Sequence, residues 1–175
     1  LIFMTSLIQN ALLVGASGLT GSKLLQHLLA DPDIGQVSVL VRQILPFNHP
    51  RLKQHEIDFN ELESQRELIQ GDIVFCCLGT TIRQAGSQAH FKTVDYFYPL
   101  TLAMLAKMNG INRFAVISAL GASAESGNFY LQVKGQLERA LAALDFEQLT
   151  IVRPSLLEGE RREFRLAERL GTIAG

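Results

Sequence analysis

The sequence predicts an α/β fold, a doubly wound parallel sheet with helices on both faces. Three observations predict it. Short apolar segments alternate with amphipathic ones along the chain, which is the pattern of parallel strands joined by crossover helices. A turn rich in glycine, residues 15–21, follows the first apolar segment and opens the first amphipathic one. The chain has 175 residues, enough for one domain with a full core and few for two.

The glycine turn is the most informative element. The apolar residues 11–14 predict a strand buried on both faces. Gly15 suits a tight turn, Gly18 allows a diphosphate to approach the main chain, and Gly21 allows the next helix to pack closely on the strand. The free N–H groups of that helix and its dipole would face the anion. This segment therefore predicts a Rossmann fold that binds a nucleotide.

The remaining elements follow from apolar periodicity and from breaking residues. Asp31 and Pro32 end the first helix, Gly71 stops a polar second helix, and Asn109 with Gly110 caps a long third one. The polar loop 83–88 is either a cover for the site or an ordinary connection. In chain order we expect strand 11–14, helix 19–30, strands 36–42 and 55–58, helix 61–69, strand 72–77, helix 89–109, strand 113–118, helix 129–144 and strand 149–152.

Composition excludes several classes of partner. A net charge of −1 gives no reason to expect nucleic acid or an anionic membrane surface, and no apolar run is long enough for a membrane span. Residues 1–4 lack the features of a signal peptide. Cys76 and Cys77 are adjacent in an expected strand, where neighbours point to opposite faces, so we expect reduced thiols and no metal site. These features predict a cytoplasmic protein.

The carboxyl-terminal region is short for this architecture. Few residues follow the last expected strand, whereas substrate pockets usually draw on segments beyond it. The mixed charges of residues 158–165 indicate a solvated helix face rather than an anion-binding patch. We therefore expect residues 1–175 to form a single NAD(P)-binding domain that lacks carboxyl-terminal segments of the substrate pocket.

The end of the second strand indicates which dinucleotide is bound. An NAD site usually presents an acidic residue there to bond the ribose hydroxyls, but this chain has Arg42. A guanidinium suits a 2′-phosphate, which predicts NADP(H) in preference to NAD(H), although a solvent-facing arginine is also common at a strand end. Ser17 and Thr20 offer hydroxyls to phosphate oxygens. Asp58 suits the adenine amino group or, equally, the N-cap of the next helix.

Tyr130 and Lys134 are the candidate catalytic pair. They lie four residues apart on an expected helix and therefore share one face. A tyrosine with an ordinary pKa of about 10 is a poor acid–base group at neutral pH. A neighbouring ammonium stabilises the phenolate and lowers that pKa, as proton transfer to a carbonyl oxygen requires.

With this pair in place, the chain resembles the short-chain dehydrogenase/reductase superfamily. More closely, it is similar to the atypical group that contains the Tat-interacting, oxidoreductase-like NAD(P)H-binding proteins. The resemblance covers nearly the whole chain. It rests on Gly-Ala-Ser-Gly-Leu-Thr-Gly (15–21), Cys-Cys-Leu-Gly-Thr-Thr (76–81), Val-Asp (94–95), Asn-Phe-Tyr-Leu-Gln-Val-Lys-Gly (128–135) and Arg-Pro-Ser-Leu-Leu (153–157).

The resemblance implies a role for each matched residue. Tyr130 would be the catalytic acid, and Lys134 would bond the nicotinamide ribose and depress the tyrosine pKa. Arg42 would meet the 2′-phosphate, and Asp58 with Phe59 the adenine. The other implied cofactor contacts are Gly15, Ser17, Gly18, Leu19, Thr20 and Gly21 at the diphosphate, Leu78, Gly79 and Thr80 at the ribose, and Arg153, Pro154 and Ser155 beside the carboxamide.

One position departs from the superfamily pattern. A serine just after the fifth strand usually polarises the substrate carbonyl, but the aligned residue here is Ala119. Ser118 is the neighbouring candidate for a catalytic role, or it satisfies backbone groups at the strand end, and Ser123 on the next loop is a possible substitute. Loss of such a donor commonly lowers a rate by about a hundredfold or more.

Three functions are therefore compared. The leading one is NADPH-dependent reduction of a small carbonyl substrate by hydride transfer, with Tyr130 as proton donor. The second is an NADPH-binding regulator or redox sensor with little or no turnover. A sugar-nucleotide epimerase or dehydratase uses the same pair but needs more chain than is available, so it ranks last. A homodimer or a protein partner is compatible with each of them.

Overall fold

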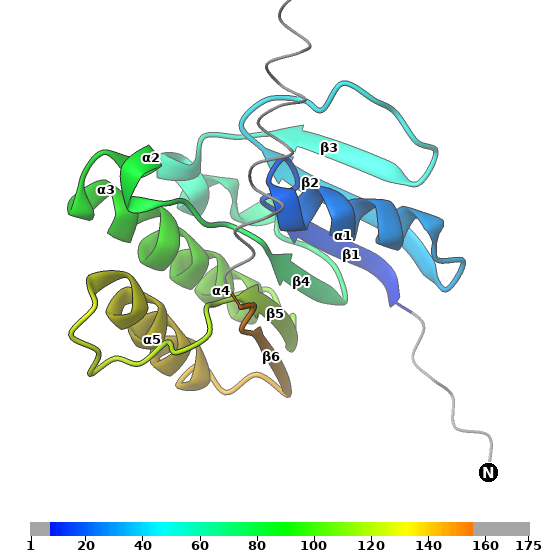
Figure 1. The fold of residues 1–175 in the computed structure, drawn as a ribbon. Helices are drawn as coiled ribbons and strands as arrows, with labels where there is room; N and C mark the ends of the chain where they lie inside the picture. The colour runs from blue at the N-terminus through cyan, green and yellow to red at the C-terminus, as the bar shows by residue number, and fades with distance from the viewer. Residues whose placement is uncertain (1–7, 156–175) are drawn as a thin grey trace, which may run out of the picture.

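The computed structural model describes residues 8–155, and six strands in it form one parallel sheet (Figure 1). Their order across the sheet is β3-β2-β1-β4-β5-β6, which reverses direction between β1 and β4. This order confirms the doubly wound sheet that the sequence predicts. The strands are β1 Ile8–Val14, β2 Ile34–Val41, β3 Leu52–Glu56, β4 Ile73–Cys76, β5 Arg113–Ile117 and β6 Gln148–Val152.

Helical segments cover both faces of the sheet (Figure 1). Apolar residues of α1 pack on one face, while those of α4, α5 and η1 pack on the other. The crossover connections therefore lie on both sides, as expected for a sheet wound in two directions. In chain order these segments are α1 Leu19–Ala30, η1 Phe59–Leu68, α2 Ile82–Ala85, α3 Gln88–Lys92, η2 Thr93–Phe97, α4 Tyr98–Met108 and α5 Phe129–Ala142.

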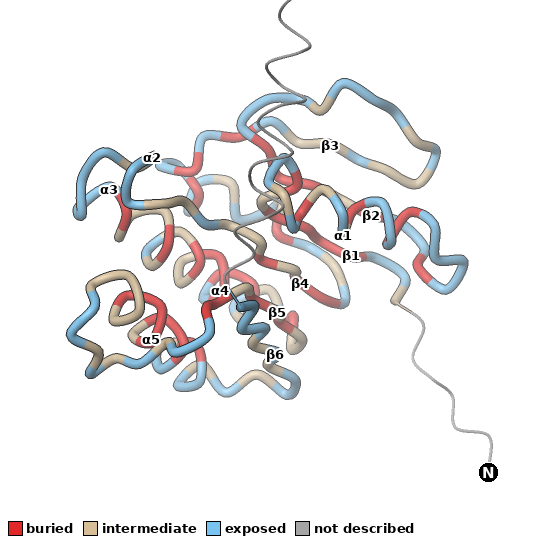
Figure 2. Tube along the Cα trace, viewed as in Figure 1, coloured by how far each residue is buried: buried red, intermediate tan, exposed pale blue. Residues whose placement is uncertain are grey.

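Strand β1 lies at the centre of the core. Its neighbours Leu12 and Leu13 are both 0% exposed but belong to separate apolar clusters, because successive strand side chains point to opposite faces. Leu12 packs in the cluster that includes α4 and α5, and Leu13 in the cluster that includes α1. Figure 2 shows that burial is concentrated in the central strands and on the inward sides of the helices. The apolar run at 11–14 is therefore buried on both faces, as predicted.

Two helical predictions need correction. The segment expected as an α-helix at 61–69 is a 3₁₀ helix, η1, and its irregular backbone at Glu61 fits its polar composition. The single long helix expected at 89–109 consists of α3, a π-helical turn η2 and α4. Apolar periodicity continues through these three segments, so it does not reveal the wider turn. The polar loop expected at 83–88 also needs correction, because its residues 83–85 belong to the short helix α2 and Gln88 begins α3.

The third strand begins at Leu52 rather than at residue 55 as expected, because its sequence lacks an apolar pattern. Strand β3 reads Leu-Lys-Gln-His-Glu and lies at the edge of the sheet, paired only with β2. An edge strand with half-buried and exposed residues carries no apolar run. The predicted ends of two helices are confirmed. Asp31 caps α1, and α4 ends at Asn109, which is followed by Gly110 in the left-handed backbone conformation.

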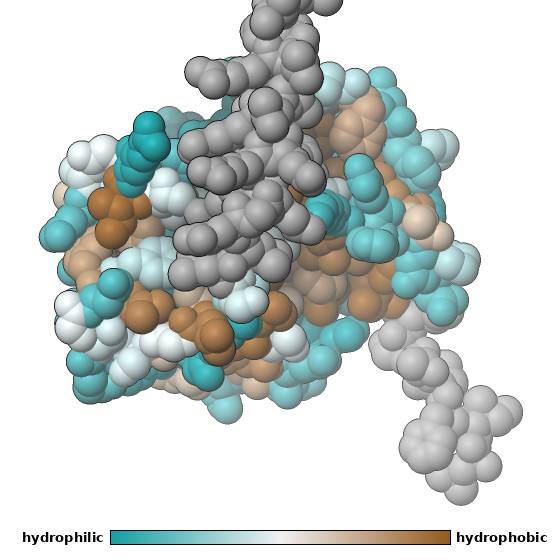
Figure 3. All heavy atoms as spheres, viewed as in Figure 1, coloured by the Kyte–Doolittle hydropathy of each residue, from teal (hydrophilic) through white to brown (hydrophobic). Residues whose placement is uncertain are grey.

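Exposed apolar side chains are spread over several elements, and in Figure 3 the hydrophobic surface of this face is divided by polar surface. Among residues 8–155, no helix has the length and apolar character needed to cross a membrane. The charged segment 158–165 and residues 1–4, for which the sequence made predictions, lie outside the described residues.

Two glycines, Gly21 and Gly18, allow a test of how closely α1 packs on the glycine turn. A Cβ added at Gly21 would lie 2.0 Å from the carbonyl oxygen of Gly15, whereas one at Gly18 would meet that atom only at 3.4 Å. We expect Gly21→Ala to lower the free energy of unfolding by about 3 kcal/mol, because backbone atoms cannot yield as a side chain does. Urea denaturation measures this loss, with Gly18→Ala as the matched control. Equal stability of the two variants would contradict the close packing of α1 on the turn.

Candidate functional site

The glycine turn packs directly against the end of β4. A Cβ on Gly15 would lie 2.6 Å from the carbonyl carbon of Cys77, and the backbone there has a φ of +86°. The Cys77 N–H donates to the Val14 carbonyl at 2.8 Å, which continues the pairing of β1 and β4 into the turn. The segments 15–21 and 78–80, both predicted to hold the cofactor, are thereby brought together at the carboxyl edge of the sheet.

The amino terminus of α1 is open to an anion. No side chain caps this helix at Gly18, and Ser17, Gly18 and Thr20 are exposed. Because the first N–H groups of a helix lack partners within it, they are available to phosphate oxygens. Leu19 is half-buried, and Gly21 is buried where α1 crosses the turn. This geometry fits the diphosphate contacts that the sequence predicts.

A cavity of about 470 Å³ lies at the ends of β2 and β3. The register pairs Val41 with Glu56, so the residues that follow these positions share one end of the sheet. The structure thus brings together Arg42 and Asp58, two of the three residues expected at the adenosine half of the cofactor, whereas the third, Phe59, does not line the cavity. Glu56 was not among the sequence candidates. The cavity is lined by Arg42, Glu56, Ile57, Asp58 and Gln65.

Asp58 has a second role that the sequence also indicated. Its carboxylate accepts from the backbone N–H of Asn60 at 2.9 Å and caps η1. Phe59 is buried, and its ring packs on Tyr98 with centroids 5.7 Å apart. The hydroxyl of Tyr98 donates to the Asn60 side chain at 2.8 Å. These contacts fix the backbone at the end of β3, where Asp58 and Phe59 were expected to meet adenine.

The candidate catalytic pair lies on α5, but Lys134 has a buried partner that the sequence analysis missed. Its Nζ lies 2.7 Å from Oδ1 of Asp95, and these two side chains are 4% and 0% exposed. Tyr130 is half-buried, with its ring centroid 5.6 Å from that of Phe91. The Val-Asp pair at 94–95 was noted for its family resemblance only. No local pattern pairs it with a lysine on another helix.

Asp95 also joins this pair to the loop after β4. Its Oδ2 accepts from the backbone N–H of Thr80 at 2.8 Å. Burial raises the pKa of the Asp95 carboxyl, and the Lys134 ammonium with the Thr80 hydrogen bond opposes that rise. Leu78 and Thr80 are half-buried and Gly79 is exposed, so this loop offers the site a small, open surface directly above the ion pair.

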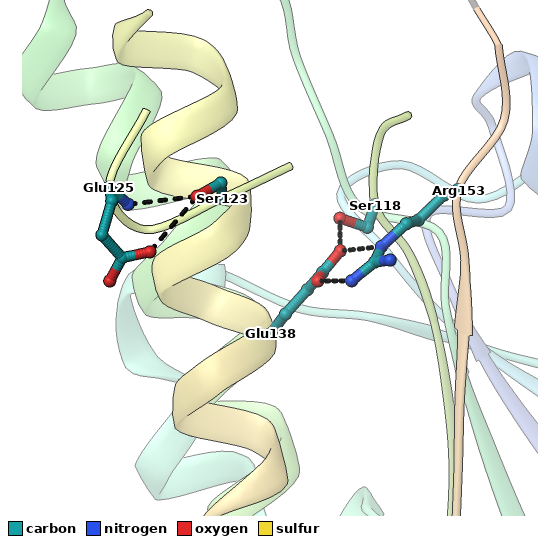
Figure 4. Close-up of polar contacts among 5 residues, drawn as sticks. All are labelled: Ser118, Ser123, Glu125, Glu138 and Arg153. Carbon is teal, nitrogen blue, oxygen red and sulfur yellow. Dashed lines mark hydrogen bonds and ion pairs between the residues drawn. The ribbon is translucent and has the colours of Figure 1, made fainter. Parts of the chain in front are cut away.

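Ser118 is engaged with charged residues (Figure 4). Its hydroxyl donates to Oε1 of Glu138, and Arg153 donates to both oxygens of the same carboxylate, with its Nε 2.9 Å from Oε1. Ser118 is 3% exposed and Glu138 8% exposed. A catalytic role for Ser118 stays a prediction, and the contacts favour a structural one. The alternative role, in which the Ser118 hydroxyl satisfies backbone groups at the strand end, is not observed, because this hydroxyl donates to Glu138 instead.

Ser123, the suggested substitute, lies on the other side of α5 in Figure 4. Its hydroxyl contacts Oε2 of Glu125 at 3.2 Å, and its backbone N–H donates to Leu131. A Cβ on Gly135 would lie 2.1 Å from the backbone of Ser123, so that glycine lets the loop pack on α5. In the segment after β6, the carbonyl oxygen of the exposed Pro154 accepts a hydrogen bond from the N–H of Leu120 at 3.2 Å.

The two cysteines offer no reactive thiolate. Burial raises the pKa of Cys76 to about 12 and that of Cys77 to about 11. Both thiols are free, as the sequence predicts. Within the part of the chain that the structure describes, no cluster of three or more His, Cys, Asp or Glu side chains is arranged to hold a metal ion.

Comparison with known proteins shows which family the chain belongs to. Residues 15–174 match a family model described as NAD(P)H-binding. The chain belongs to the NAD(P)H-binding family. It is 38% identical over 166 residues to the protein HTATIP2 of Rattus norvegicus, covering 93% of this chain and 68% of that protein. It is also 32% identical over 162 residues to the mitochondrial protein FMP52 of Saccharomyces cerevisiae, covering 87% and 67%.

Solved structures of low sequence identity share this fold. A UDP-glucose 4-epimerase from Thermotoga maritima matches with a TM-score of 0.69 and 16% identity, over 82% of this chain and 54% of the epimerase. A putative NAD-dependent epimerase/dehydratase from Bacillus halodurans matches with a TM-score of 0.70 and 22% identity, over 84% and 70%. The chain thus spans about half the length of the first of these enzymes. Likeness at this level shows the fold alone.

The Glu138 cluster predicts an acid-sensitive contribution to the stability of this NAD(P)H-binding domain. Burial alone would raise the pKa of Glu138, but the hydrogen bonds from Arg153 and Ser118 hold it below its usual value. A carboxyl with a lowered folded-state pKa stabilises the fold above its unfolded-state pKa, and this contribution is lost as the pH falls through the folded-state value. We therefore expect acidification to lower the urea midpoint more in the wild type than in Glu138→Gln.

Glu125→Gln is the matched control for that experiment, because its ion pair with Arg139 is exposed on both sides. Its pH dependence should follow the wild type. Parallel pH profiles for Glu138→Gln and the wild type would show that the cluster does not hold the ionised carboxylate.

Proposed function

We propose that this chain is the cofactor-binding part of an NADPH-dependent oxidoreductase that reduces a small carbonyl substrate. One observation carries the proposal. Lys134 is fixed beneath the loop after β4, one helical turn from Tyr130, at the same edge of the sheet as the glycine turn. Membership of the NAD(P)H-binding family supports the cofactor class. The substrate and the reaction are our proposal.

In this proposal, different parts of the site bind different parts of the cofactor. The open amino terminus of α1 holds the diphosphate, and the loop 78–80 meets the nicotinamide ribose. Arg42 lies exposed at the cavity and binds the 2′-phosphate, which favours NADP(H) over NAD(H). Glu56 and Asp58 line the same cavity, so the preference depends on one cation acting beside two carboxylates. When bound, NADPH supplies the hydride that reduces the carbonyl carbon.

The proton comes from Tyr130 in this proposal. Its phenol donates to the carbonyl oxygen as that oxygen gains charge, while Lys134 bonds the ribose and orients the phenol. The Asp95 carboxylate offsets part of the ammonium charge. Lys134 therefore acts through its fixed position more, and through its charge less, than the spacing of Tyr130 and Lys134 alone suggests. Pro154 follows β6, and the family resemblance implies that it lies beside the carboxamide.

A regulator that binds NADPH with little turnover is the second candidate, and a specific observation favours it. Ala119 has no hydroxyl, Ser118 donates to Glu138, and Ser123 contacts Glu125. None of the three therefore offers an uncommitted hydroxyl to a substrate carbonyl. A sensor needs the cofactor site but no such donor.

Location and partners stay predictions. The sequence favours the cytoplasm, whereas the FMP52 relative is named as a mitochondrial protein. A small carbonyl compound is the expected substrate, and a homodimer or a protein partner is compatible with either function. The epimerase reading stays last, because likeness to epimerases is limited to the fold.

Replacing the acid tests the reaction. We expect Tyr130→Phe to lower kcat/KM for NADPH oxidation with aldehydes, ketones or quinones by about 10²- to 10⁴-fold, the usual contribution of a general acid. Absorbance at 340 nm follows the reaction. Tyr96→Phe is the matched control and should retain activity. Full turnover by Tyr130→Phe would exclude the assigned acid, and tight NADPH binding without turnover in the wild type would favour the regulator.

Replacing the guanidinium tests cofactor choice. Arg42→Ala should weaken NADPH binding about tenfold or more, with little change for NADH, because a charge-assisted pair with the 2′-phosphate is lost. Fluorescence of the reduced nicotinamide measures both dissociation constants. The exposed Arg139 lies on α5, away from the cavity, and Arg139→Ala serves as the charge-matched control. Equal losses for NADPH and NADH in Arg42→Ala would disprove the assignment.

A further inference from the structure

Asp95 occupies the one π-helical turn of the described residues. This turn, η2, separates α3 from α4, and Asp95 is its buried residue. Wider turns of this kind are rare and are often found at functional sites. The carboxylate is 0% exposed and contacts two segments that are distant in sequence, the loop after β4 and helix α5.

Both oxygens of Asp95 are used, each by a different partner. Oδ1 contacts the Lys134 ammonium at 2.7 Å, and Oδ2 accepts from the Thr80 N–H at 2.8 Å. An asparagine has one oxygen and could satisfy only one of these donors. A buried ion pair is a poor source of net stability, because removing two charges from water costs about as much as their attraction returns. This arrangement fixes positions better than it stabilises the fold.

The ion pair lies beneath Gly79 at the open edge of the sheet. A Cβ added there would lie 3.4 Å from Oδ1 of Asp95 and 3.8 Å from Nζ of Lys134. Gly79 is exposed, so its backbone lies between the pair and the surface. The preceding residues, 77 and 78, pack against Gly15. A ligand that extends from the glycine turn past β4 thus comes close to Lys134.

We propose that Asp95 is the positioning residue of the nicotinamide half of the site, which it builds by fixing the Lys134 ammonium and the Thr80 backbone together beneath Gly79. The inference rests on the proposed NADPH-binding function and adds a residue to it. Asp95 itself is too deeply buried to meet the cofactor. It acts through its two partners, and the adenosine half, at Arg42 and Asp58, does not depend on it.

Two ligands separate these halves. NADP⁺ spans the whole site, whereas 2′,5′-ADP carries the adenosine and the 2′-phosphate but no nicotinamide ribose. We expect Asp95→Asn to weaken NADP⁺ binding about tenfold, as measured by calorimetry, and to leave 2′,5′-ADP within about twofold of the wild type. Asp33→Asn, at the exposed turn before β2, is the matched control and should bind both ligands normally.

A pH profile of the wild-type protein repeats the test without a substitution. Lys134 of α5 and Cys76 of β4 are the titratable groups that face Asp95 in the described residues, and Glu138 reaches Lys134 from the next turn. The buried Asp95 takes up a proton at a higher pH than an ordinary carboxyl. Acidification should therefore weaken NADP⁺ relative to 2′,5′-ADP in the wild type but not in Asp95→Asn. The 2′-phosphate is common to both ligands, so its own titration cancels.

The outcomes are distinct. Selective loss of NADP⁺ supports the inference, and an Asp95→Asn variant that binds NADP⁺ normally overturns it. Equal weakening of both ligands shows a general structural role and also overturns it. If Asp95→Asn does not fold, a wild-type affinity ratio that stays constant on acidification decides against the inference. A wild type that binds neither ligand refutes the proposed function itself, and the role of Asp95 with it.

Discussion

The candidate site depends on one constraint, the close backbone contact of the glycine turn with the end of β4. No side chain fits between Gly15 and Cys77, or between Gly21 and Gly15, because a single Cβ would approach backbone atoms to 2.6 Å and 2.0 Å. Strand pairing continues through this contact by way of the Val14 carbonyl. The amino terminus of α1 and the loop after β4 are therefore held side by side at the carboxyl edge of the sheet.

From this contact the site extends in two directions with different physical character. Toward β3 it is open, and the cavity beside Arg42 is lined mainly by exposed polar residues. Toward β5 and β6 its cations are held by buried carboxylates: the buried Lys134 pairs with Asp95, and the exposed Arg153 pairs with Glu138. The open end suits recognition of a charged ligand through exposed groups. The other end suits fixed geometry, because each of its buried carboxylates also accepts a hydrogen bond from a neutral donor, Asp95 from Thr80 and Glu138 from Ser118.

Sequence predicts those features that are encoded locally. The apolar runs locate the central strands, and the glycine spacing locates the turn, because each depends on neighbouring residues alone. Edge strand β3 and helix η1 are less well predicted, since exposed polar segments lack periodicity. The pairs Asp95–Lys134 and Ser118–Glu138 could not be predicted. Each joins residues from different elements, and only the packing of α5 against η2 and the sheet brings them together.

The balance of charge around Lys134 bears on whether the site is built for turnover. Asp95 touches the ammonium, and Glu138 lies one turn further along α5, so a buried cation has two carboxylates near it. Such a lysine is well placed to bind ribose hydroxyls but contributes less positive field to a reacting carbonyl. A second donor to the carbonyl oxygen then matters more, and Ala119 cannot be that donor. Among the serines that the sequence offers for this role within residues 8–155, Ser118 donates to Glu138 and Ser123 to Glu125, so the binding geometry for a cofactor is more complete than the geometry for polarising a carbonyl.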